Sequence, residues 1–344
     1  MKNKRLLSGV CAFTMVMSLA ACGGGASSAT ATTAAGETQA AAGQPAGEAA
    51  YTPEGNYNIR VFAAAGGIAD TVTRITAQSL QEQYGVTPII NNITGASGAV
   101  AATDMDGYDP SIHEMSLVSM SLFTMSPLMN PDIKVSLDNY GIVGSLIRDE
   151  FVLLVSKDSG ITSWEDLAAY GKDQPIIYAS NTPGGFTHVV QTALFGDAGL
   201  DGQALTSDGS NKDILALMSG DAICASATAS LAKNYVESGD VIPIMIFSEN
   251  NYTGFEGYDV PSSVSLGFDI TLPSYNFLIT RAGVPQEELD GMYAAIKACR
   301  ESDSFKTAAE AAAYDPDDTD GATLRAEIEA YAKDCEEIFN KYYK

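Results

Sequence analysis

Short apolar runs alternate with amphipathic segments along most of the chain, from residue 59 onward. The runs predict strands at residues 59–62, 88–90, 115–119, 151–155, 176–180, 223–227 and 241–247. Helical spacing of apolar residues predicts helices at residues 70–84, 164–171, 187–195, 211–218, 231–238, 285–300, 304–313 and 323–342. This alternation of strands and helices predicts an α/β protein with parallel or mixed sheets.

The first residues follow a different pattern. Three cations lie within the first five positions, residues 6–20 are mostly apolar, and Leu-Ala-Ala at 19–21 precedes Cys22. This pattern is typical of a secretion signal, and the apolar run is shorter than the roughly 20 residues that a membrane-spanning helix needs. It resembles the lipobox of bacterial lipoproteins. We therefore predict a signal peptide at residues 1–21 and lipidation of Cys22, which would anchor an extracytoplasmic protein to the outer face of the cell membrane.

A flexible tether is predicted next, at residues 22–55. Residues 23–50 are almost wholly small or polar, so they cannot bury enough apolar surface to offset the entropy of ordering. The remaining segment exceeds the size at which one core usually splits into two. Two lobes are therefore expected.

Charge and cysteine content narrow the range of partners. The chain carries 19 Lys and Arg against 43 Asp and Glu, a formal charge of −24, which disfavours nucleic acid as a partner. An anionic ligand stays possible, because local backbone dipoles can bind it. With Cys22 assigned to lipid, Cys299 and Cys335 are in separate predicted helices, and a disulfide between them is left open. No cysteine or histidine spacing indicates a metal site, and no cofactor is predicted.

Two glycine-bearing turns are the candidate ligand sites. The first leads from strand 59–62 through Ala-Ala-Ala-Gly-Gly at 63–67 into a helix, and the second leads from strand 176–180 through Asn-Thr-Pro-Gly-Gly at 181–185 into another. Open α/β sheets bind ligands where strands pass into helices. Unpaired N–H groups and the helix dipole at such a turn can bind a carboxylate or phosphate. Two facing turns would suit a dicarboxylate.

The same residues resemble a known family. Residues 62–74, Phe-Ala-Ala-Ala-Gly-Gly-Ile-Ala-Asp-Thr-Val-Thr-Arg, are similar to the first signature of the substrate-binding proteins of tripartite tricarboxylate transporters, the Bug family. Residues 178–188, from Tyr-Ala-Ser to Thr-His, are similar to the second signature. Further matches follow in the family's order at Asn92 with 95–98, 220–221, 259–261 with Gly267, and 282–285.

This resemblance implies a two-lobed type II periplasmic-binding-protein fold, the Venus flytrap, with a mixed sheet in each lobe. Lobe one would comprise residues 56–150 and 272–344, and lobe two residues 151–271. The receptor would act as a monomer that delivers a small carboxylate to a permease of one large and one small subunit. The implied ligand contacts are Ala64, Ala65, Gly66 and Gly67 in lobe one and Ser180, Asn181, Thr182, Gly184, Gly185 and Thr187 in lobe two.

One departure from the family bears on the ligand. Ser-Asp-Gly at residues 207–209 stands where the family often has Tyr-Lys-Gly. Asp208 near the cleft would repel a second carboxylate or attract an ammonium group. A zwitterion such as an amino acid, bound by an ABC-type receptor, therefore remains an alternative. A secreted hydrolase is a further alternative with little support, because the chain has two histidines and no Gly-x-Ser-x-Gly motif.

Neighbouring residues are expected to have structural roles. Asp70 is predicted to cap its helix and fix the first turn, and His188 to brace the second turn. The acidic run 315–321 is expected to be a solvated turn that caps the last helix, because Pro316 would occupy the first ligand position of a calcium loop. Gly66→Asp and Gly184→Asp are expected to abolish ligand binding while leaving the fold intact.

Overall fold

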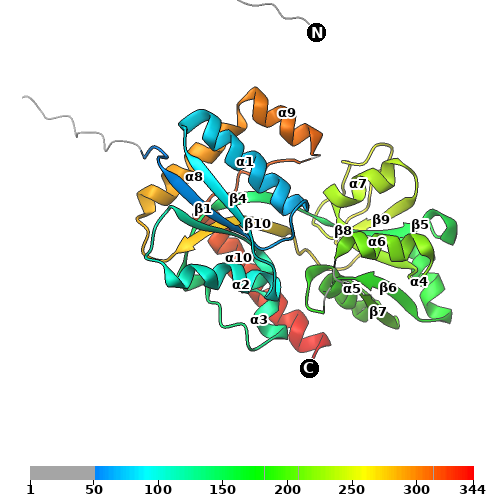
Figure 1. Cartoon of the computed structure of the whole chain (residues 1–344). Coiled ribbons are helices and arrows are strands. Elements are labelled where there is room, and N and C mark those ends of the chain that lie inside the picture. The colour runs from blue at the N-terminus through cyan, green and yellow to red at the C-terminus, as the bar shows by residue number, and fades with distance from the viewer. Residues whose placement is uncertain (1–50, 182, 208, 313) are drawn as a thin grey trace, which may run out of the picture. The chain divides into compact units, whose positions relative to one another are not determined.

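Two five-stranded sheets with flanking helices form the described part of the chain (Figure 1). The computed structural model describes residues 51–181, 183–207, 209–312 and 314–344. The predicted signal peptide, Cys22 and the tether up to residue 50 lie outside the described residues, as do Thr182 and Asp208. The predicted α/β fold with two mixed sheets is confirmed.

The first sheet has the order β2-β1-β3-β10-β4. Its strands are β1 (Asn56–Val61), β2 (Thr87–Asn92), β3 (Glu114–Ser119), β4 (Tyr140–Asp149) and β10 (Ser274–Arg281). β1 is parallel to β2 and β3, whereas β10 is antiparallel to β3 and β4. Strands from both ends of the described chain therefore build this sheet.

The second sheet has the order β7-β6-β8-β5-β9. Its strands are β5 (Phe151–Ser156), β6 (Ile176–Ser180), β7 (Gly202–Thr206), β8 (Cys224–Thr228) and β9 (Val241–Ile246). β6 is parallel to β7 and β8, and β5 is antiparallel to β8 and β9. The chain enters this sheet at Glu150, between β4 and β5, and leaves it between β9 and β10. We call the two sheets with their helices lobe one and lobe two.

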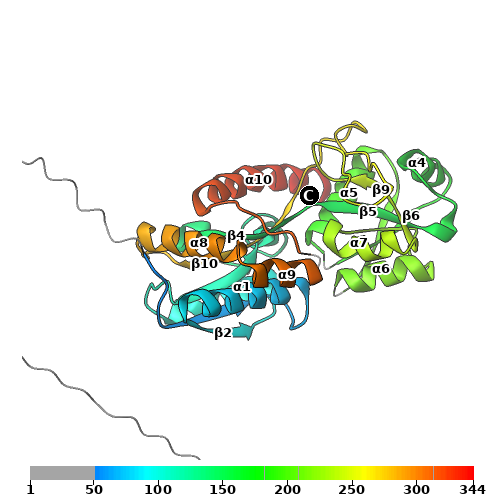
Figure 2. The ribbon, with the colours of Figure 1, turned by 90° about the horizontal axis from the view of Figure 1, so that it is seen from above.

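The α-helices cover both faces of each sheet. They are α1 (Ile68–Tyr84), α2 (Ala99–Thr103), α3 (Met125–Met129), α4 (Trp164–Asp173), α5 (Phe186–Asp197), α6 (Ser210–Ser219), α7 (Ala229–Glu237), α8 (Gln286–Arg300), α9 (Asp303–Ala311) and α10 (Gly321–Tyr342). Helices α1, α8 and α9 pack on one face of the first sheet, and α6 and α7 on one face of the second (Figure 2).

Side-chain caps explain where some helices begin. The Ser163 hydroxyl accepts the Asp166 N–H at the start of α4, and the Asp320 carboxylate accepts the N–H groups of Ala322 and Thr323, each at 2.9 Å, at the start of α10. The acidic run therefore ends in a helix cap, as expected. Helix α4 continues to Asp173, beyond the predicted end at Gly171, because Gly171 does not adopt the left-handed conformation that ends a helix.

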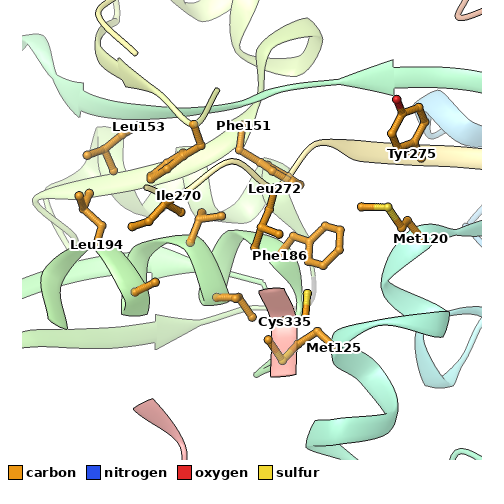
Figure 3. Packing of buried hydrophobic residues seen from close by; sticks show 14 of the residues in the cluster. Met120, Met125, Phe151, Leu153, Phe186, Leu194, Ile270, Leu272, Tyr275 and Cys335 are labelled. Carbon is orange, nitrogen blue, oxygen red and sulfur yellow. The ribbon is translucent and has the colours of Figure 1, made fainter. Parts of the chain in front are cut away.

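One apolar cluster extends along a face of both sheets. Met120 and Met125 of lobe one pack in the same cluster as Phe186 and Leu194 of α5, together with Cys335 of α10 (Figure 3). Helix α10 begins beside β4, where Gly144 bridges to Asp320, and its end reaches α5. The C-terminal helix therefore links the lobes, in addition to the two connecting segments.

The described cysteines are free thiols. Cys224, Cys299 and Cys335 are all buried and unpaired, so the disulfide left open by the sequence is absent. Burial raises the pKa of the Cys299 thiol to about 11 and that of Cys335 to about 12. Both thiols therefore stay neutral and behave as small apolar groups of the core. No helix within the described residues is long and apolar enough to cross a bilayer.

Candidate functional site

A buried carboxylate holds loop one, residues 62–67, between β1 and α1. Asp70 Oδ2 accepts the Gly66 N–H at 2.8 Å and the Arg74 Nε–H at 2.9 Å. Asp70 Oδ1 accepts from Asn92 Nδ2 at 2.9 Å. Asp70 is 2 % exposed, whereas its partner Arg74 has a half-exposed side chain, so the network is only partly shielded from water. Asp70 fixes the first turn, as predicted, but it lies within the first turn of α1 and does not occupy the predicted cap position, which is Gly67.

Asn92 connects loop one to the neighbouring strand. Its Nδ2 also donates to the Ala63 carbonyl at 2.9 Å, and its Oδ1 accepts from Arg74 Nη2 at 3.2 Å. Asn92 ends β2, which pairs with β1 along its whole length. The loop is therefore fastened at both ends, by Asp70 on the helix and by Asn92 on the strand.

These contacts change the acidity of Asp70. Hydrogen bonds from Arg74, Gly66 and Asn92 outweigh burial and lower the pKa of the Asp70 carboxyl to about 2, from an ordinary value of 3.8. The carboxylate therefore stays charged at every physiological pH. Because the folded pKa is the lower one, ionised Asp70 stabilises the fold above pH 4, and this contribution disappears as the pH falls toward 2.

We predict the size of this effect from the shift. Between pH 6 and pH 2 the wild-type protein loses about 2 kcal/mol of unfolding free energy through Asp70 alone. Asp70→Asn cannot ionise, so its unfolding free energy should fall by about 2 kcal/mol less than that of the wild type between pH 6 and pH 2. Urea unfolding at the two pH values measures both losses. Equal drops in the two proteins would show that Asp70 has an ordinary pKa.

The Asp70 network decides which amides of loop one are available. The Gly66 N–H is bonded to Asp70, and the Gly67 N–H donates to the Ala64 carbonyl at 3.3 Å. By contrast, within the described residues the exposed amides of Ala64 and Ala65 have no hydrogen-bond acceptor. The sequence placed all four residues at the ligand. In the structure the N–H groups of Gly66 and Gly67 are bonded within the turn. The N–H groups of Ala64 and Ala65, together with those at the start of α1, are left to donate hydrogen bonds to a ligand.

Loop two, residues 181–185 between β6 and α5, is braced by its own helix. The Thr187 hydroxyl accepts the Asn181 N–H at 3.0 Å, and His188 Nδ1 accepts the Gly184 N–H at 3.5 Å. The same nitrogen lies 2.9 Å from the Tyr343 hydroxyl. Burial lowers the pKa of His188, which favours the neutral imidazole, whose Nδ1 can accept the Gly184 N–H. His188 therefore supports loop two, as the sequence indicated.

Two polar atoms at the start of loop two lack partners. Ser180 Oγ and Asn181 Oδ1 are buried and make no hydrogen bond in the described part of the chain. An unsatisfied buried polar group costs about 1–3 kcal/mol, so such atoms favour a ligand or water that can bond to them. The Asn181 side chain packs against Gly185, where there is no room for a larger residue. A Cβ added to Gly185 would lie 2.7 Å from Asn181 Cγ.

Both loops lie where the lobes meet. A Cβ on Gly184, which has φ +84°, would lie 2.8 Å from Met129 Cβ of α3, so loop two touches lobe one. Ile68, directly after loop one, lines a cavity together with Ser230 and Lys233 of α7 in lobe two. That the two loops face one common space remains a prediction.

The cavity beside Ile68 was not predicted from the sequence. It encloses about 940 Å³ next to the β4–β5 connection. Its charged lining residues are mostly acidic, namely Asp149, Glu150, Glu249, Glu310 and Asp315 against Arg148 and Lys233. This balance disfavours a dicarboxylate there.

The N-terminus of α7 in this cavity already holds a carboxylate of the chain itself. Asp149 accepts from the Ser230 hydroxyl and from the Ser230 N–H at 3.3 Å, and burial raises its pKa. A helix start that is capped in this way cannot bind an external anion through the same N–H groups. No cluster of three or more His, Cys, Asp or Glu that could hold a metal occurs among the described residues.

Comparison with known proteins places the chain in a family. A UPF0065 protein of Bordetella bronchiseptica is 22% identical over 248 residues, which cover 72% of this chain and 73% of that protein. An adipate-bound protein of R. palustris has the same fold, with TM-score 0.74, 19% identity and coverage of 84% and 98% of the two chains. Malate-bound MatC of Rhodopseudomonas palustris also has this fold, with TM-score 0.69 and 18% identity. The match covers 83% of this chain and 99% of MatC. The model of the tripartite tricarboxylate transporter family receptor matches residues 72–338, so the chain belongs to this receptor family.

Proposed function

We propose that this receptor captures a small di- or tricarboxylate outside the cytoplasm and delivers it to a tripartite tricarboxylate-type permease. It would do so as a monomer, anchored through lipid on Cys22 to the outer face of the cell membrane. Members of the family are solute-binding receptors rather than enzymes. Beyond this family role, we propose the class of solute, the lipid anchor on Cys22 and delivery to the permease.

The observation that carries the proposal is the rigid presentation of free amides in loop one. Asp70 and Asn92 fix the turn, while the N–H groups of Ala64 and Ala65 stay exposed at the start of a 17-residue helix. A helix start carries a partial positive charge, and fixed N–H donors need no reorganisation to bind a carboxylate. Loop one can therefore bind an anion without a side-chain cation.

Loop two would bind the second carboxylate. Its unpaired atoms are the Ser180 hydroxyl, which can donate a hydrogen bond to an anion, and Asn181 Oδ1, which as an acceptor would bond to water or to a hydroxyl group of the ligand. Gly184, Gly185 and Thr187 would shape the loop through the contacts described above. Thr182 and Asp208 lie outside the described residues, and their contact with the ligand stays a prediction.

The neighbours of the same fold support this chemistry. Their bound molecules, adipate and malate, are both dicarboxylates. Two amide-bearing loops, one in each lobe, would match the two charged ends of such a molecule. The carboxylate that contacts loop one, Asp70, is paired with Arg74, which offsets its charge.

A thermal-shift panel tests the proposal. Mono-, di- and tricarboxylates and amino acids are each added to the purified protein, and we expect a dicarboxylate to raise the melting temperature by several degrees. At 100 times its dissociation constant a ligand stabilises the native state by about 2.7 kcal/mol. A shift with amino acids alone would favour the zwitterion alternative, and turnover of chromogenic esters would favour the hydrolase.

A further inference from the structure

Strand β7 forms an open edge of the second sheet. Four of its five residues are exposed, and the sheet order places it at one end. The Ile176 N–H donates to the Asp201 carbonyl at 2.7 Å, and the Ser207 N–H donates to the Ser180 carbonyl at 2.9 Å. Odd-numbered residues therefore bond inward to β6. By alternation, the N–H and C=O groups of Ala204 and Thr206 point outward, where no described residue pairs with them.

The other sheet edges are protected. In β2, the inward bonds of Thr87 and Ile93 put Pro88 at an outward position, where its ring blocks a further strand. The edge at β4 is covered by residues 319–320, and the Ser145 N–H donates to the Thr319 carbonyl at 2.9 Å.

At β9 the next segment pairs with the end of the strand, at Ile246. The Ile246 N–H donates to the Pro261 carbonyl at 2.9 Å. Strand β7, Gly-Gln-Ala-Leu-Thr, has no proline, no charged residue and no such cover in the described chain. Among the described sheet edges, β7 is therefore the one that can accept another strand.

Four exposed apolar side chains lie on β7, on its neighbour β6 and on α6, which packs against β6. We define the β7 patch as Ile177, Leu205, Leu215 and Met218, which are 44%, 40%, 57% and 40% exposed. Ile177 and Met218 line one cavity of about 330 Å³. Leu205 pairs with Ala179 and so shares a sheet face with Ile177, and Leu215 lies three residues before Met218 on α6. Exposed apolar patches of this kind mark interaction sites.

The charge of the protein indicates what binds there. A second copy would bring together two molecules of formal charge −24, which repel each other. The cavity at the patch is lined by Asp158 and Asp221, without Lys or Arg among its described lining residues. The surface therefore complements a segment that combines apolar and basic residues.

We propose that the permease docks on lobe two by adding an extended segment to β7. Main-chain groups of that segment pair with Ala204 and Thr206, its alternate apolar side chains cover the β7 patch, and flanking basic residues approach Asp158 and Asp221. This inference rests on the proposed delivery to a permease. It adds the docking surface and the chemistry of the docking segment.

The docking edge is coupled to the ligand loop by a backbone bond. The Ser207 N–H, directly after β7, donates to the carbonyl of Ser180, where loop two begins. A strand paired with β7 therefore extends the same ladder that positions the proposed ligand contacts. A change in loop two when the ligand binds can therefore alter the position of the end of β7 that the permease contacts.

The test compares two variants at one backbone position. Ala204→Pro removes an outward N–H without breaking the ladder to β6, whereas Ala204→Val keeps the N–H and favours the strand. Binding is measured to the large and small subunits of a tripartite tricarboxylate-type permease reconstituted in nanodiscs. We expect at least a tenfold loss of affinity for Ala204→Pro and less than a twofold change for Ala204→Val. Both variants should keep the thermal shift of the wild type in the carboxylate panel.

The outcomes separate the two proposals. Equal binding of wild type and Ala204→Pro overturns the docking surface and leaves the receptor function in place. Absence of wild-type binding, with the carboxylate shift retained, overturns delivery to this permease and the docking surface together.

A second pair of variants leaves the backbone unchanged. Leu215→Lys places a cation in the β7 patch and should weaken binding at least fivefold, whereas Val264→Lys, at an exposed valine outside the patch, should not. In hydrogen exchange of the wild type, the permease should slow the amides of Ala204 and Thr206. Unchanged exchange there would overturn the proposal even if Ala204→Pro fails to fold.

Discussion

Asp70→Ala is expected to remove about 3 kcal/mol of unfolding free energy and to weaken binding in the carboxylate panel at least tenfold. The substitution leaves the Gly66 N–H and the Asn92 amide without their buried acceptor and deprives Arg74 of its ion pair. Hydrogen bonds to a charged group contribute about 1.5–3 kcal/mol each, and the losses overlap because the groups form one network. Urea unfolding and thermal shift measure the two effects.

Asp70→Asn is the matched control. It keeps the shape and can still accept the Gly66 N–H, but it loses the charge that Arg74 binds. Its loss of stability should be smaller than that of alanine, and its ligand affinity should lie between alanine and wild type. An Asp70→Ala protein with unchanged stability and affinity would show that loop one holds its shape without the carboxylate, and the proposed role of the loop would fail.

Gly184→Ala is expected to destabilise the protein by about 3 kcal/mol. The left-handed backbone, φ +84°, costs a non-glycine residue about 1–2 kcal/mol, and the new methyl group meets the Met129 side chain, which adds a similar amount. Gly66→Ala is the control for strain alone, since φ is +82° and nothing lies within 4 Å of its added Cβ. We expect it to cost about half as much in urea unfolding.

A double-mutant cycle separates packing from backbone strain. Met129→Ala in the Gly184→Ala background removes the contact with Met129 Cγ but keeps the Cβ, so it should restore part of the packing loss, giving a coupling energy of about 1 kcal/mol. Additive effects would show that loop two does not touch α3. The same geometry bears on the aspartate variants, because the Cβ of Gly184→Asp would meet Met129 and destabilise the fold, whereas the Cβ of Gly66→Asp meets no atom within 4 Å and carries only the backbone strain.

The periodicity of apolar residues predicted most elements of the fold. Strands β1, β3, β5, β6, β8 and β9 and the longer helices lie within one to three residues of the predicted ranges. Strands β4 and β10 were missed. Glycines and Ser145 interrupt the apolar run of β4, and buried Asn276 interrupts that of β10. Strand β7 was missed because it is exposed on its open side and has no apolar alternation.

The candidate site was predictable only in part. Paired glycines after a strand identified both loops, and the position of Asp70 at a helix start predicted its role. Nothing local showed that Asn92, 29 residues from Ala63, would complete the network. The cavity next to Ile68 was not predictable either, because its lining comes from segments between residues 68 and 331.

The sequence by itself determined the α/β class, the positions of the two glycine loops and the resemblance to the receptor family, because periodicity, turn chemistry and motif order are local properties. Tertiary structure alone decided which amides remain free, that Met129 lies against Gly184, and that Asp149 already caps α7. These features depend on contacts between residues far apart in the chain, and packing of the two lobes brings such residues together.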